Sequence, residues 1–185
     1  MITKDEIIKI INPETDLEKR ILNDSVFISG VNYGKVRNGH PEGEIIYHIR
    51  DIFRNIDNEN HILSVRSKLR LIALFHDTFK FKVNYDLPRV GENHHGYKAR
   101  KFAERYISDK DILQIIECHD DAYNIWKRSS RRNEWEKGEK DLLKFIDKIN
   151  DIDLYSYFYY CDNSTGSKKN DDYEWFLEIS GLWKK

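Results

Sequence analysis

Imidazole and carboxylate side chains recur along this chain in sequence that is otherwise apolar and helical. His48 lies in an isoleucine-rich segment, and the doublet His76-Asp77 follows a long apolar run. Further candidates of the same two types occur downstream, at His94, His95, His119 and Asp147. Imidazole nitrogens and carboxylate oxygens are the ligands that divalent metals use in sites without thiolates. The sequence therefore predicts a divalent-metal site.

Each of these residues, taken alone, also has a plainer interpretation. A single histidine on an apolar helix face is most often a hydrogen-bonded core residue. A buried aspartate is costly unless it is paired or bound to a cation. Several helices that each turn such a residue inward are hard to explain by chance, so the whole set favours a metal site. The absence of thiolates argues against structural zinc and suits Mn²⁺, Fe²⁺, Co²⁺, Ni²⁺ or Mg²⁺.

Helices are predicted for the segments that carry the histidines. Apolar residues at 45, 46, 49, 52, 53 and 56 follow the spacing of a buried helix face, and His48 lies within that stripe. Residues 63–82 are apolar almost all round and predict a central helix that carries the doublet. Further helices are expected from His95 onward and, capped by Ser108, up to His119.

The remaining segments are also predicted to be helical, so the fold class is all-α. A capping box of Thr3 and Glu6 opens a short helix before Pro13, and a second helix is expected over 14–28. One long helix over 134–160 would carry Asp147. Two shorter stretches complete the chain: a basic connection at 127–132, and a terminal aromatic helix over 171–180 closed by Gly181.

Composition limits the class of protein. The 185 residues suit a single domain, 1–185, and a net charge of −1 gives no general attraction to nucleic acid or membranes. Two cysteines make no disulfide framework, and we find neither a signal peptide nor a run long enough to span a bilayer. We expect a cytoplasmic protein.

The ordered set His48, His76-Asp77 and Asp147 resembles the HD superfamily of metal-dependent phosphohydrolases. The resemblance covers roughly residues 40–155 and implies one compact helical-bundle domain that is the whole enzyme. The segment His40-Pro41-Glu42-Gly43, followed by His48, is similar to HD domains of bacterial tRNA nucleotidyltransferases. The spacing His76-Asp77-x-x-Lys80 resembles an extended form of the family motif.

The resemblance also implies a ligand set. A first metal would be held by the ordered residues of the motif, His48, His76, Asp77 and Asp147. Some family members hold a second metal with additional histidines, and His95 and His119 match those positions best. His94 remains an alternative to His95. On ligand count we expect two divalent ions and not one.

The expected chemistry is hydrolysis of a phosphoester, catalysed by Asp77, Lys80 and Glu42. Asp77 would bridge the metals or orient the attacking water. Lys80 would neutralise a phosphate oxygen, although a solvated lysine is as good an explanation. Glu42 would hydrogen-bond a metal-binding histidine or act as a general acid.

The substrate is expected to be a small phosphorylated molecule, most plausibly a nucleotide or cyclic nucleotide. Besides Lys80, candidate substrate-binding residues are Lys98, Arg128 and Arg131, each of which also fits an ordinary solvated surface. The C-terminal aromatic residues are interpreted chiefly as core, and they leave a homodimer open.

Two other functions fit the same residues. HD-type diiron oxygenases resemble this chain in fold and ligand order, and Lys80 with the basic stretches favours phosphate over that alternative. A module that binds a nucleotide or nucleic acid without turnover is the second alternative. An intact ligand set argues against it, and near-neutral charge makes a general nucleic-acid partner unfavourable.

Overall fold

The regular structure of the chain is helical throughout. The computed structural model describes residues 1–36, 41–59, 61–166 and 169–182. Within these ranges the helices are joined by turns, and the one β-type pairing is an isolated bridge between Gly34 and Glu44. The predicted all-α class is confirmed. His40, the first residue of the segment that suggested a nucleotidyltransferase-type domain, lies outside the described residues.

Three short helices form the N-terminal part: α1 (Lys4–Ile11), α2 (Asp16–Ile21) and α3 (Ser25–Val31). The predicted capping box is present, since Thr3 accepts from the Glu6 amide and Glu6 caps in return. The prediction of one helix over 14–28 was wrong. The chain turns at residues 22–24, where Asp24 accepts a hydrogen bond from the Val26 amide and begins a new helix.

The centre of the molecule is built from α4 (Ile45–Asn58) and α5 (Leu63–Phe75). The buried stripe of α4 is the predicted one and includes His48. Helix α5 ends seven residues before the predicted boundary at 82, and the 3-10 helix η1 (Lys80–Lys82) comes after a turn. Thr78 in this turn donates to the carbonyl of Leu74, which competes with continuation of the helix. The doublet His76-Asp77 is therefore at the end of a helix and not inside one.

The next part comprises η2 (Gly91–Asn93), α6 (His95–Ala103), α7 (Lys110–Cys118) and α8 (Asp121–Arg132). Helix α6 begins at His95, as predicted. The N-cap of α7 is Asp109 and not Ser108. The basic stretch over 127–132 was predicted to be a connection, but it forms the second half of α8, in which Ser129 continues the buried face of Ala122 and Ile125.

The C-terminal part contains α9 (Trp135–Ile146), α10 (Ile152–Asn163) and α11 (Asp171–Ser180). The prediction of one long helix over 134–160 was wrong. Asp147 is the C-cap of α9, and Asp151 begins α10 by accepting a hydrogen bond from the Leu154 amide. The terminal helix is closed by Gly181 at φ 73°, in the left-handed region where glycine is favoured.

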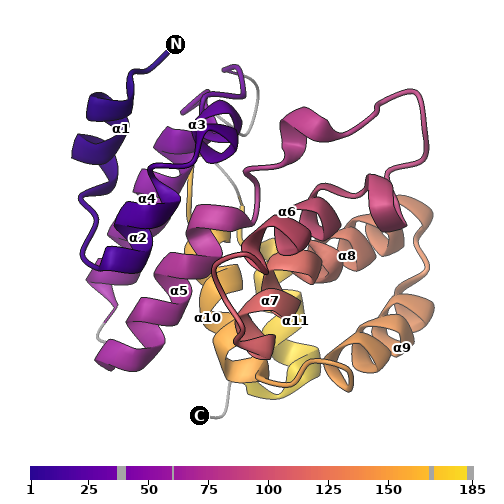
Figure 1. Ribbon diagram of the computed structural model, residues 1–185. Helices are drawn as coiled ribbons and strands as arrows, with labels where there is room; N and C mark the ends of the chain where they lie inside the picture. Colours follow the sequence, from indigo (N-terminus) through magenta and orange to yellow (C-terminus); the bar gives the residue numbers. More distant parts are fainter. Residues whose placement is uncertain (37–40, 60, 167–168, 183–185) are drawn as a thin grey trace.

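Helix α5 occupies the middle of the assembled molecule (Figure 1). It contacts α4 and α6 as well as α7 and α10, while α1–α3 lie towards one side and α8 and α9 towards the other. The C-terminal aromatic residues Tyr155, Phe158 and Phe176 are fully buried, which confirms their interpretation as core. Among the described residues, no helix is both long and apolar enough to cross a bilayer.

Candidate metal centre

His76 ends α5 with its imidazole completely buried. Its Nδ1 lies 2.9 Å from the carbonyl oxygen of Ala73, three residues back, and must donate a proton to it. In the neutral ring Nε2 then carries a lone pair. That atom lies 3.4 Å from Nε2 of His48. The backbone thus fixes the tautomer in which His76 can act as a metal ligand.

His48 is aimed at the same point from the buried face of α4. On one side of its ring, Nδ1 lies 3.5 Å from Glu42 Oε1 and 3.3 Å from Thr165 Oγ1. Thr165 itself donates to the carbonyl of Asp162, so its oxygen is free to accept from His48. On the other side, Nε2 lies 3.0 Å from Asp162 Oδ1. Glu42 and Thr165 therefore orient the ring so that Nε2 faces the site.

Asp77 joins two groups of histidines through its two oxygens. Oδ2 faces the first pair, at 3.6 Å from His76 Nε2 and 3.9 Å from His48 Nε2. Oδ1 faces the second pair, at 3.3 Å from His95 Nε2 and 3.4 Å from His119 Nε2. A carboxylate arranged in this way can bridge two cations.

His119 ends α7 in the same manner as His76 ends α5. Its Nδ1 lies 3.0 Å from the carbonyl oxygen of Ile116, again three residues back, and its side chain is buried. Its Nε2 lies 3.2 Å from Nε2 of His95, the first residue of α6. Helices α6 and α7 approach closely here, since a Cβ on Gly96 would lie 2.2 Å from the carbonyl oxygen of Glu117.

His94 lies beside this second pair but is turned to a different partner. Its Nδ1 accepts a hydrogen bond from the Gly96 amide and caps α6, so a neutral ring carries its proton on Nε2. That Nε2 lies 3.6 Å from Asp120 Oδ1. The geometry thus favours His95 over His94 as a ligand facing Asp77, although His94, His95 and Asp120 also lie close enough to form a group of potential ligands.

Burial and charge set the protonation of the cluster. Burial lowers the pKa of His76 to about 3 and also lowers the pKa of His95. Burial works in the same direction on His119, but the hydrogen bond to Asp77 and the charge of Asp120 outweigh it and raise the pKa of His119 to about 9. Burial opposes ionisation of Asp77, yet Lys80 and the histidines hold its pKa well below the usual range. The metal-free cluster therefore keeps positive charge on His119.

Asp147 is not brought into the cluster. It is exposed at the end of α9, and it belongs to none of the groups of potential ligands among the described residues. Asp162, near the end of α10, belongs to none of these groups either, but its Oδ1 lies 3.0 Å from His48 Nε2. The periodicity over 134–160 concealed the break between α9 and α10. Asn150 and Asp151 were the signal in the sequence, because Asn and Asp are typical of helix starts. They indicate that a new helix begins here, with its own acidic residues as candidate ligands.

The donors present suit a divalent cation. One potential ligand atom from each of His48, His76 and Asp77 lies within 4.8 Å of the other two, and the same holds for Asp77, His95 and His119. Among the described residues, Asp77 Oδ1 is buried and makes no hydrogen bond of regular geometry. A buried carboxylate oxygen surrounded by imidazole nitrogens is stabilised by a cation. The donor set is nitrogen and oxygen only, as predicted.

A cavity of about 480 Å³ opens onto the first group, a volume within the range of small-molecule sites. His48 and Asp77 line it together with Glu42 and Lys80. Lys80 is ion-paired with Asp77 Oδ2, so the predicted lysine does lie at the site. Sequence reasoning missed Lys35, which also lines the cavity, and the two tyrosines at its edge, Tyr33 and Tyr85, whose hydroxyl oxygens are 3.3 Å apart.

The other candidate substrate-binding residues lie elsewhere. Lys98 lines a separate surface hollow on α6 and η1. Arg128 and Arg131 are exposed on α8, and Arg128 lies 3.5 Å from Asp141 of α9. Neither arginine lines the cavity or the hollow.

Comparison with known proteins gives one match. The sequence model of the HD domain family matches residues 44–153, which includes His48, the doublet and the second pair of histidines. The matched span ends nine residues before Asp162. No curated protein and no solved structure matches the chain. The similarity to tRNA nucleotidyltransferases therefore stays a prediction.

Proposed function

Because the chain belongs to the HD domain family, we propose that it is a divalent-metal-dependent phosphohydrolase that acts on a small phosphate ester. The observation that carries this proposal is Asp77, whose two oxygens face two different histidine pairs beside an open cavity. Members of this family are generally metal-dependent hydrolases.

The residues that would hold a first cation are His48, His76, Asp77 and Asp162. Those that would hold a second are Asp77, His95 and His119. Divalent cations in such a site supply Lewis acidity that makes water nucleophilic at neutral pH and offsets phosphoryl charge. Asp162 would take the place that the family resemblance suggested for Asp147, and the 3.0 Å distance between its Oδ1 and His48 Nε2 supports this assignment.

The other residues of the site would orient ligands and bind phosphate. Glu42 and Thr165 hold the His48 ring from its far side, which supports an orienting role for Glu42. Lys80 and Lys35 place positive charge on the wall of the cavity, where a phosphate group would enter. Tyr33 and Tyr85 offer aromatic surface at its edge.

We propose a nucleotide as the substrate, on the basis of the residues that line the cavity. Two lysines and metal-binding residues line it together with two tyrosines, whose rings can stack on a base. A cavity of about 480 Å³ accommodates a ligand of that size.

The test is phosphate release by metal-stripped protein that is resupplied with Mn²⁺, Co²⁺ or Fe²⁺. The panel contains nucleoside mono- and triphosphates, cyclic nucleotides and a generic phosphodiester. We expect turnover that needs metal, is lost in Asp77→Ala and is kept in Asp147→Ala, a matched removal of an exposed aspartate. Equal turnover by wild type and Asp77→Ala would overturn the assigned site. No phosphate release by protein that retains iron and consumes O₂ would favour an oxygenase instead.

A further inference from the structure

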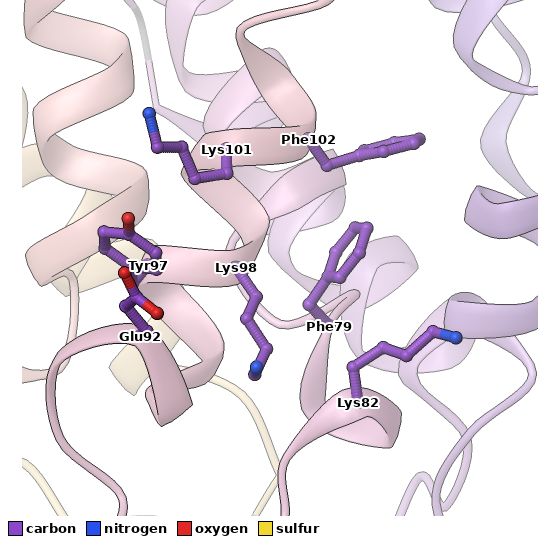
Figure 2. A pocket seen from close by; sticks show the side chains of 7 residues that line it. All are labelled: Phe79, Lys82, Glu92, Tyr97, Lys98, Lys101 and Phe102. Carbon is purple, nitrogen blue, oxygen red and sulfur yellow. The ribbon is translucent and has the colours of Figure 1, made fainter.

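A surface hollow next to η1 is lined by three lysines, one glutamate and three aromatic residues. Its lining comes from η1 and the adjoining Phe79, from η2 and from α6: Phe79, Lys82, Glu92, Tyr97, Lys98, Lys101 and Phe102. Figure 2 shows Lys98 extending between Glu92 on one side and Phe79 and Lys82 on the other. The hollow shares no lining residue with the cavity at the metal centre.

The lysines of this hollow are incompletely neutralised. Lys101 lies 3.1 Å from Glu104, but among the residues that the structure describes neither Lys82 nor Lys98 has an acidic partner within 4.0 Å. Lys82 rests instead on the ring of Phe81, 5.1 Å from its centre. Lys98 is half-buried and lines the hollow without an acidic partner in contact among those same residues. An anion would supply the negative charge.

The lysines are spread over two elements, which indicates a ligand with several charges. Lys98 and Lys101 lie one helical turn apart on α6, and Lys82 reaches the hollow from η1. The floor between these elements is rigid, since Phe79 of the preceding turn and Phe102 of α6 are buried with ring centres 4.8 Å apart. A linear chain of phosphates carries several charges and can contact lysines from both elements.

We propose that this hollow is a second anion site, separate from the metal centre, and that it binds a polyphosphate group. Tyr97, which lines the same hollow beside Lys98, gives a nucleoside polyphosphate an aromatic surface that inorganic polyphosphate would not use. An occupant would bridge η1 and α6, the elements next to Asp77 and His95.

The test is titration calorimetry of metal-free wild-type protein with inorganic triphosphate at low ionic strength. We expect saturable binding that weakens with salt. The Lys82→Ala/Lys98→Ala double variant should bind at least about tenfold more weakly, since charge-assisted hydrogen bonds are lost. Lys98→Arg should retain binding. Lys140→Ala, which removes an exposed lysine of α9, should leave the affinity unchanged. Lys80→Ala reports whether triphosphate binds in the cavity at the metal centre instead.

Binding that is lost in Lys80→Ala but kept in the double variant would overturn the proposal, as would no saturable binding to the wild type. A parallel titration with a nucleoside triphosphate identifies the source of the polyphosphate. Tighter binding that is lost in Tyr97→Ala assigns a nucleotide, and equal affinities assign inorganic polyphosphate. No catalysis enters this measurement, so its outcome is independent of the proposed function.

Discussion

The chain contains two His-Asp doublets, at 76–77 and 119–120, and they begin with the same local structure. Each histidine is the C-cap of a helix in right-handed conformation, and each bonds through Nδ1 to the carbonyl three residues back. Both imidazoles are buried with Nε2 turned towards Asp77. In both doublets the carbonyl three residues back holds Nδ1 and leaves Nε2 facing Asp77.

The aspartates of the two doublets differ. Asp77 points into the cluster and touches both histidine pairs, whereas Asp120 turns to His94 and starts α8. The difference arises from the path of the chain beyond each doublet. After Asp77 the chain makes a tight turn into η1 and brings Lys80 back onto the carboxylate, while after Asp120 it enters a helix directly. The two histidines are therefore oriented in the same way, whereas the residues after each doublet determine which partner its aspartate contacts.

The largest expected effect separates the two aspartates. Asp77→Asn should lower turnover by at least about 1000-fold, because several kcal/mol of transition-state stabilisation depend on both cations. Asp120→Asn should lower it by about 10–100-fold, as is typical for a residue outside the ligand shell. Steady-state kinetics of both variants, with circular dichroism as a folding control, makes the comparison. Equal losses would mean that Asp120 is also a ligand.

The second prediction concerns the acidic partner of the first doublet. Asp162→Ala should weaken binding of the first metal by about 100-fold or more. Removing a metal ligand lowers the affinity at least as much as removing a residue that hydrogen-bonds to a ligand. Asp147→Ala should leave it unchanged, because Asp147 is exposed at the end of α9. Competition with a chromophoric chelator measures both affinities. A loss confined to Asp147→Ala would restore the assignment made from the sequence.

The third prediction concerns the second doublet. His94→Ala removes the partner of Asp120 and the cap of α6, and should weaken the second metal by about tenfold while two ions still bind. His95→Ala should reduce the stoichiometry to one. Metal analysis after gel filtration distinguishes the two variants. Loss of the second ion in His94→Ala alone would identify His94 as the ligand.

The smallest effect is on the pH dependence of stability in metal-free protein. The pKa of His119 is raised to about 9 in the folded protein. Its stabilising contribution to the free energy of unfolding is therefore complete below pH 6.5 and is lost as the pH rises through 9. The pKa of His76 is lowered to about 3, so His76 destabilises the fold as pH falls from 6.5 to 3. His119→Gln should reduce the loss of unfolding free energy between pH 6.5 and 9 by on the order of 2 kcal/mol. His76→Gln should reduce the loss of unfolding free energy as the pH falls from 6.5 to 3.

Chemical denaturation from pH 3 to pH 9 measures the free energy of unfolding and so tests both effects.

The positive charge on His119 also implies that metal binding at pH 7–8 releases a proton from this residue. Calorimetry in buffers of different ionisation enthalpy detects that release. Metal uptake without proton release would contradict the charge assigned to His119.

Much of the fold was predictable because its core helices carry regular apolar periodicity. The buried face of α4 and the start of α6 at His95 follow directly from the sequence. The positions at which helices end were harder to predict, because apolar residues continue past them. At Phe75 the Thr78 hydroxyl takes the Leu74 carbonyl, and after Ile146 the Asp151 side chain caps a new helix at the Leu154 amide, and periodicity registers neither contact.

The candidate site was predictable to the same degree. His48, His76, Asp77 and His119 were identified because each lies in or follows apolar sequence, where a polar residue requires a reason, whereas His95 was chosen through the family resemblance. Asp162 was missed because the break before α10 was missed, and with it the register of the last helix. Lys35, Tyr33 and Tyr85 lie in polar connections, where nothing in the sequence distinguishes a cavity wall from ordinary surface.

The contact between His48 and Asp162 spans 114 positions of the chain. A cation shared by these residues would act as a cross-link, closing a loop that includes most of the domain and so restricting the unfolded chain. It would also complete the site late in synthesis, because Asp162 and the orienting Thr165 leave the ribosome after the other residues of the candidate site. Metal loading would then report that the last helices have docked.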